Sequence, residues 1–114
     1  MKTLDPRQAA RGAVAATPAR AANALIHDSD DARLVVFRIE PGQAVAPHRS
    51  SSTVVLSVLE GTALLIGDEN GESRESTHAA GSAVVFAPGE LHGMRAEQDT
   101  VLILATITPR PGSR

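Results

Sequence analysis

Two stretches of the sequence decide the fold, and a glycine opens each of them. Residues 42–61 read GQAVAPHRSSSTVVLSVLEG, and residues 81–93 read GSAVVFAPGELHG. Both contain runs of β-branched residues next to glycine- and proline-containing turns, a pattern typical of strands. Each stretch also carries a histidine, His48 in the first and His92 in the second. The sequence therefore predicts two strand regions that each present one imidazole.

The same pattern continues on both sides of these stretches. Residues 34–39, 53–59 and 100–108 are the clearest strands, and turn signals recur along the chain. The polar residues 73–78 are expected to form an edge or solvent-facing strand. Roughly seven or eight short strands at this spacing indicate a sandwich or barrel. We therefore expect an all-β fold, with a helix only in the first 24 residues.

Size and composition limit the classes of protein. The chain has 114 residues, enough for one domain, and 42% of them are apolar. No apolar run is longer than that of residues 101–105, which is far shorter than the ~20 residues of a membrane-spanning helix. A net charge of −2 without a basic stripe argues against nucleic-acid binding. The absence of cysteine excludes disulfides and zinc–thiolate sites. No signal peptide is recognisable, and we expect a cytoplasmic protein.

The N-terminal segment differs from the rest in charge. Residues 1–22 hold four basic residues and one acidic residue, a net charge of +3, whereas the remainder carries −5. We expect residues 1–23 to be an arm, residues 24–110 to be the barrel and residues 111–114 to be a tail. Attraction between opposite charges favours docking of the arm on a body, either its own or that of a neighbouring copy.

The last predicted strand is apolar on both faces. Residues 101–107 read VLILATI, whereas a sheet with one wet face should alternate apolar and polar residues. A second covering layer is implied, and a partner subunit is its simplest source. We expect a homodimer built by sheet packing or strand exchange that involves the N-terminal half. The alternative is a monomer whose own arm covers the apolar face.

Taken together, the two glycine-framed stretches resemble the two motifs of the cupin superfamily. In the first stretch Gly42, His48 and Gly61 fall in the motif's register. In the second, Gly81, Gly89 and His92 do so, with Ala87 where the motif has a proline. The resemblance covers residues ~32–108 and is closest to small single-domain bacterial cupins. It implies a double-stranded β-helix, also described as a jelly-roll barrel.

The resemblance also implies a degenerate metal site. Cupin metal sites take two histidines and a glutamate from the first motif and a histidine from the second. In this chain the four positions hold His48, Ser50, Val54 and His92, so two ligands are missing. His48 and His92 remain candidate ligands, but a divalent metal usually requires three or more protein ligands. We expect little or no metal, and no metal held by four protein ligands.

The same residues predict a small-molecule pocket between the motifs. A small acidic or hydroxylated ligand suits two imidazoles beside a serine and apolar neighbours. One alternative is a metal-dependent cupin enzyme, a dioxygenase or isomerase, with a reduced ligand set. Another is a purely structural dimerisation scaffold. Whether the protein is a catalyst stays open. The residues expected to line the pocket are His48, Ser50, Val54, Phe86, His92 and Met94.

Three other polar residues are expected on the surface of the barrel. Arg49 alternates with its two neighbours along the strand and should point away from the interior. His78 belongs to the polar strand and should be solvent-exposed. Glu90 lies in a turn, where a carboxylate is usually solvated.

Overall fold

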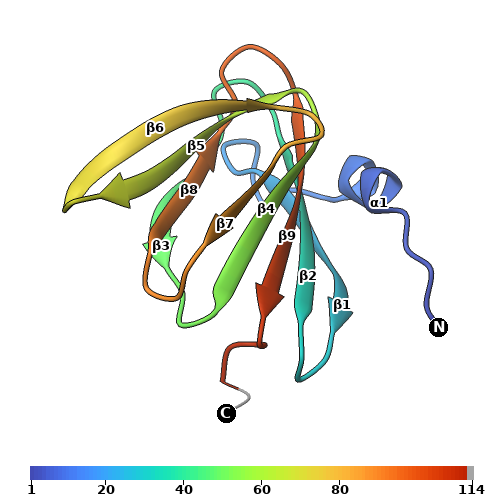
Figure 1. Cartoon of the computed structure of the whole chain (residues 1–114). Coiled ribbons are helices and arrows are strands. Elements are labelled where there is room, and N and C mark those ends of the chain that lie inside the picture. The colour runs from blue at the N-terminus through green and yellow to red at the C-terminus, as the bar shows by residue number, and fades with distance from the viewer. Residues whose placement is uncertain (113–114) are drawn as a thin grey trace.

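The computed structural model describes residues 1–112, in which nine strands form two sheets packed face to face, with one short helix outside them (Figure 1). The prediction of an all-β fold is confirmed. The elements are α1 Pro6–Gly12, β1 Ala22–Asp28, β2 Arg33–Ile39, β3 Ala44–Arg49, β4 Thr53–Glu60, β5 Thr62–Glu69, β6 Glu72–Ala79, β7 Ala83–Phe86, β8 Leu91–Arg95 and β9 Val101–Thr108.

The strand order is that of a double-stranded β-helix. One sheet has the order β1-β2-β9-β4-β7 and the other has the order β3-β8-β5-β6, and neighbouring strands are antiparallel. Strands far apart in the chain, such as β2 and β9, lie side by side, as in a jelly roll. Within the described residues no strand pairing joins the two sheets, so the molecule is a two-layer sandwich rather than a closed barrel. The polar strand β6 lies at a sheet edge, as predicted.

The main core lies between the sheets and is built from alternate residues of their strands. From β9, Val101, Ile103 and Ala105 point into this core, whereas Leu102 points out of it. Strand β4 contributes by the same alternation. The inward face of β9 is therefore explained by ordinary two-sheet packing.

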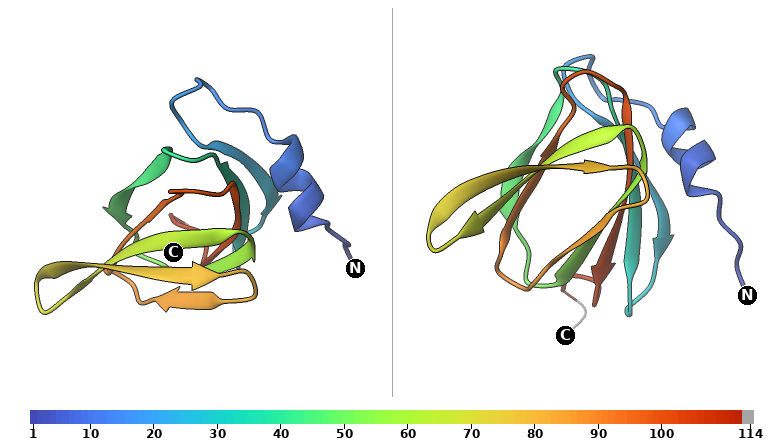
Figure 2. Two further views of the ribbon diagram at one scale, coloured as in Figure 1. Left: turned by 90° about the horizontal axis from the view of Figure 1, so that it is seen from above. Right: turned by 45° about the horizontal axis from the view of Figure 1, so that its top comes forward.

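Part of the outward face of β9 is covered by helix α1 of the same chain. Ala10 of α1 is fully buried against Val36 of β2 and Leu102 of β9. Seen from above, α1 lies outside the five-stranded sheet, beside β1 (Figure 2). Around Leu102 the covering layer is thus the chain's own helix, because the small side chain of alanine lets α1 approach the sheet closely.

Polar contacts hold the arm on the body. The Asp5 carboxylate accepts a hydrogen bond from the Gln8 N–H and caps α1, which has proline at its first position. At the other end of α1, the Arg38 guanidinium donates to three main-chain carbonyls, including that of Ala13 at 2.8 Å. Arg11 pairs with Glu60. The basic arm therefore docks on its own body, and β1 begins at Ala22, inside the segment expected to be arm.

The glycine that closes the first motif is required by a close approach. Gly61 has a φ of 77°, and a Cβ there would lie 2.5 Å from the carbonyl oxygen of Thr100. Any other residue would push apart the β4–β5 turn and the start of β9.

In the described chain, no helix has the length and apolar character needed to cross a membrane.

Candidate functional site

The two motif histidines face each other across a pair of neighbouring strands. His48 of β3 and His92 of β8 are directly opposed in the antiparallel ladder. Their Nε2 atoms are 3.1 Å apart, and the rings meet edge to face with centroids 4.2 Å apart. The expected geometry, with both imidazoles directed into one cavity, is what the structure shows.

An irregular strand pairing brings the two rings together. The register of β3 against β8 shifts between Val45 and His48, which places a bulge beside Pro47. Opposite that bulge is Gly93, where a Cβ would lie 3.0 Å from the Cα of Pro47. Glycine therefore allows the bulged strand to approach closely, and the next pair along the ladder is His48 and His92.

Main-chain carbonyls orient both rings. His48 Nδ1 lies 3.0 Å from the carbonyl oxygen of Ala46, and His92 Nδ1 lies 3.3 Å from that of Glu90. A carbonyl oxygen only accepts, so each Nδ1 carries the proton and donates it. The two Nε2 atoms are then acceptors that face each other when both rings are neutral. A shared proton, a hydrogen-bond donor or a cation between them would relieve the repulsion of their lone pairs.

Burial favours the neutral form of the inner histidine. His92 is only 5% exposed, and the Phe86 ring packs with its centroid 5.5 Å away. Burial lowers the pKa of His92 from its usual value. The hydrogen bond to the Glu90 carbonyl raises this pKa, and the nearby His48 lowers it further. At physiological pH His92 is therefore a neutral ring whose Nε2 accepts hydrogen bonds.

An open pocket of about 370 Å³ lies at the histidine pair. Its apolar part comes from Val54, Ile107 and Pro111, and no carboxylate is among its lining residues in the described chain. The full lining is His48, Arg49, Ser50, Ser51, Val54, His92, Ile107 and Pro111. Four of the six residues expected to line the pocket from the sequence are in this set.

Phe86 and Met94 lie elsewhere than expected. Both are buried in the core between the sheets, where Phe86 backs the ring of His92 and Met94 faces Val45. The inward direction of Met94 agrees with strand alternation, but the sheets close over both side chains and leave the open space nearer the strand ends. Ile107 and Pro111 line that space instead. The alternation along β9 could have indicated Ile107, whereas no pattern indicates Pro111.

A polar brace holds the turn that precedes His92. Arg49 donates to the carbonyl of Gly89 at 2.8 Å and pairs with Asp68 at 3.2 Å. The other carboxylate oxygen of Asp68 accepts the N–H of Leu91 at 3.1 Å. Arg49 thus lies at the pocket rim and clamps the β7–β8 turn. Sequence reasoning missed Asp68 because its partners are distant in the chain.

The other two polar residues singled out from the sequence lie away from the pair. The Glu90 carboxylate accepts the N–H of Ala87 within its own turn at 3.1 Å. His78 is half-buried rather than fully exposed, and its Nε2 lies 2.7 Å from the Ser76 hydroxyl.

The residues at the pair do not complete a metal site. Two imidazole nitrogens bound to one ion at about 2.0–2.1 Å and about 100° would lie about 3.1 Å apart, so His48 and His92 fit one edge of a coordination shell. In the register of the motif resemblance, Ser50 and Val54 stand where the other two ligands would be expected. Among the residues that the structure describes, no group of three histidine, cysteine, aspartate or glutamate side chains is placed to hold an ion. Among the described residues, the pair therefore supplies two candidate ligands, His48 and His92.

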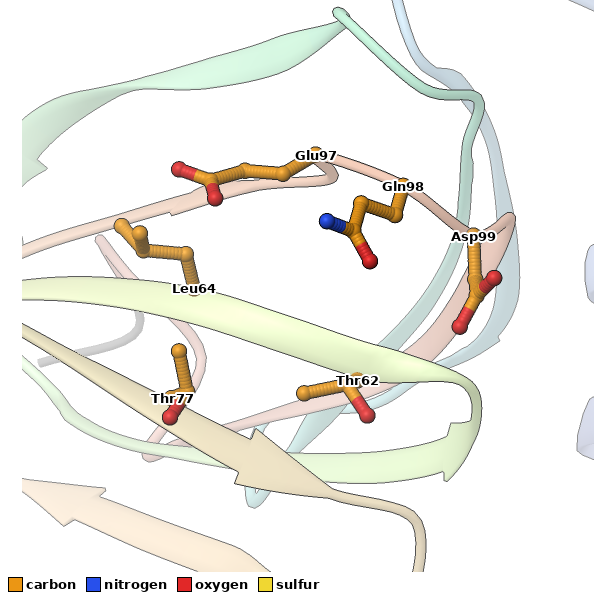
Figure 3. Close-up of a pocket in the computed structure, with 6 residues that line it drawn as sticks. All are labelled: Thr62, Leu64, Thr77, Glu97, Gln98 and Asp99. Carbon is orange, nitrogen blue, oxygen red and sulfur yellow. The ribbon is translucent and has the colours of Figure 1, made fainter.

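A second pocket, of about 290 Å³, lies on the outer side of the four-stranded sheet. Figure 3 shows hydroxyl groups of β5 and β6 on one side and the loop before β9 on the other. It contains no imidazole, and one of its carboxylates, Glu97, pairs with Arg95 at 3.2 Å. Its lining is Thr62, Leu64, Thr77, Glu97, Gln98 and Asp99. No sequence motif marks this pocket, because a loop folded over a sheet creates it.

Comparisons with known proteins agree with this architecture. A search of curated proteins finds no match. A double-stranded β-helix protein from Klebsiella pneumoniae has a TM-score of 0.81 at 16% identity, over 100% of this chain and 94% of its own. The protein TT1209 from Thermus thermophilus has a TM-score of 0.80 at 27% identity, over 97% and 100%.

Bacillus subtilis oxalate decarboxylase, whose Mn(II) centres have been studied, shares the fold at a TM-score of 0.67 and 20% identity, over 78% of this chain and 25% of its own. A family model for the cupin domain matches residues 35–108, from β2 to the end of β9. Since this match includes both histidine-bearing strands and most of the two sheets, the chain belongs to the cupin family.

Proposed function

We propose that this cupin binds a small hydroxylated molecule at the His48–His92 pair. The observation that carries the proposal is the convergence of two Nε2 atoms, 3.1 Å apart, at an open pocket. Both Nδ1 atoms already face main-chain carbonyls, so the Nε2 atoms are free to accept from a ligand. A hydroxyl group beside the pair, within hydrogen-bond distance of both nitrogens, would donate to one Nε2 and reduce the repulsion between the two lone pairs.

The rest of the lining supports a small and mostly uncharged ligand. Val54 and Ile107 offer an apolar surface, and Ser50 and Ser51 offer hydroxyls that can both donate and accept. A positively charged amine would lack a compensating carboxylate among the lining residues. A carboxylic acid is compatible, provided that a proton enters with it and is shared with an imidazole.

The test uses thermal shift with simple probes. Glycerol, lactate and glycolate sample neutral and acidic hydroxylated compounds, and a ligand that binds only the folded state raises Tm. His48→Gln and His92→Gln each weaken one acceptor, and we expect affinity to fall about three- to tenfold, the range for one hydrogen bond. His78→Gln is the matched control, because His78 bonds to Ser76 on β6.

Two outcomes would count against this function. A probe that binds equally well to the wild type and to both pocket variants binds elsewhere. If no hydroxylated probe shifts Tm at millimolar concentration, the proposal loses its basis and a purely structural scaffold becomes the better interpretation.

One observation favours a second candidate, a metal-dependent cupin enzyme with a reduced ligand set. The separation of the two Nε2 atoms, 3.1 Å, matches one edge of a coordination shell. Elemental analysis of untagged protein tests it, since a stoichiometric metal would favour this candidate over the first. The double variant Ser50→His with Val54→Glu should gain metal binding if the backbone frame is that of a complete cupin site.

A further inference from the structure

The C-terminal segment crosses the end of the sandwich that holds the histidine pocket. Figure 1 places the end of β9 at the same end of the molecule as the β1–β2 turn and the β3–β4 loop. Residues 109–112 follow β9, and Pro111 among them lines the pocket together with His48 and His92. One wall of the site is therefore made by a segment outside both sheets.

Two side-chain hydroxyls fix the start of this segment. The Ser52 hydroxyl, in a residue only 2% exposed, donates to the carbonyl of Pro109 at 2.5 Å. The Thr108 hydroxyl donates to the carbonyl of Asp31 at 2.8 Å. These bonds connect the segment to the β3–β4 loop on one side and to the β1–β2 turn on the other.

Arg110 adds an ionic contact to the β1–β2 turn. Its Nε is 3.0 Å from Asp28 Oδ1, its Nη1 is 4.0 Å from Asp30 Oδ1, and its main-chain N–H donates to the Asp30 carbonyl at 3.2 Å. Within the described residues, the buried Nε makes no hydrogen bond of good geometry. Its pairing with Asp28 is therefore an attraction between charges and not a well-aligned hydrogen bond. Such a contact can break while the strand ladder stays intact.

We propose that residues 109–112 form a strap over the histidine pocket and that the Arg110–Asp28 pair is its latch. Release of the latch moves Pro111 away and opens the pocket toward His92. The strap as a regulator of ligand access rests on the proposed function. Its effect on the exposure of His92 does not, and that effect can be measured without any ligand.

The experiment compares the rates at which diethyl pyrocarbonate modifies individual histidines. Trypsin cuts after Arg74 and Arg95, so His78 and His92 fall in one peptide, and fragmentation distinguishes them. His78 lies on β6, away from the strap, and serves as an internal control. Arg110→Gln should raise the His92-to-His78 ratio about two- to fivefold, the range for loss of a partly exposed ion pair. A chain ending at Pro109 should raise it more.

Matched controls keep the result interpretable. Arg11→Gln removes the pair between α1 and Glu60 at the end of β4 and should leave the ratio unchanged. Far-ultraviolet circular dichroism checks that each variant is folded. If the truncated chain does not fold, Arg110→Gln still decides the matter. An unchanged ratio in folded Arg110→Gln overturns the latch, and an unchanged ratio in a folded truncated chain overturns the strap, whether or not any ligand binds.

Discussion

Replacing Leu102 by alanine tests whether α1 packs on the sheet of its own chain. Leu102 of β9 is 1% exposed, and its side chain packs against Val36 of β2 and Ala10 of α1. Truncation of a buried leucine costs about 2–5 kcal/mol, from lost burial and from the cavity that remains. Because its cover on one side is a single seven-residue helix that can move inward, we expect the lower part of this range, about 2–3 kcal/mol.

Urea unfolding measures this loss as a difference in the free energy of unfolding. Val85→Ala is the matched control, because Val85 lies on the outer face of the same sheet but is 65% exposed, and it should cost less than about 0.5 kcal/mol. The reasoning is refuted if Leu102→Ala costs no more than Val85→Ala. Deletion of residues 1–13 should reduce the cost of Leu102→Ala, since the helix that covers the side chain is then absent.

Three further predictions concern pH, the first motif and assembly. Because the pKa of His92 is lowered in the folded protein, the unfolded chain binds more protons than the folded one between that pKa and 6.5. Stability should therefore fall as the pH drops through this range, and His92→Gln should make the urea midpoint depend less on pH. Gly61→Ala should destabilise the fold by more than about 1 kcal/mol, because its Cβ would meet the Thr100 carbonyl; an unchanged urea midpoint would contradict the close approach. Although α1 covers Leu102, the outer face retains Val55 and the exposed Val85, so we still predict a homodimer, and sedimentation equilibrium at micromolar concentration showing only 11.8 kDa would exclude it.

Much of the fold could be predicted from local sequence patterns. Strands β2, β4 and β9 are indicated by runs of β-branched residues, and several turns are indicated by glycines. Each of these signals lies within a few consecutive residues. The bounds of strand β3 could not be predicted in the same way, because its pairing with β8 is irregular beside Pro47 and most of its residues are exposed. The destination of the arm could not be predicted either, since docking of α1 depends on Ala10 meeting strands far away in the chain.

Only the part of the candidate site that follows from local sequence patterns could be predicted. The motif register predicted that His48 and His92 point into one cavity, and the structure brings them together on neighbouring strands. The rest of the pocket depends on where the two sheets separate, which residue alternation does not specify. Met94 points inward, as predicted, but it lies in the closed core and not in the pocket. Pro111 lines the pocket because contacts made by Ser52 and Arg110 hold the C-terminal segment there.

The histidine pair itself is tested most directly by the protonation of its ring nitrogens. Long-range ¹H–¹⁵N correlation spectra of the labelled protein above pH 7 distinguish the two neutral forms of each of the four histidines. The account predicts that His48 and His92 both carry the proton on Nδ1, with Nε2 unprotonated, and that nuclear Overhauser contacts connect the two rings. Two rings protonated on Nε2 with no Overhauser contact between them would contradict it.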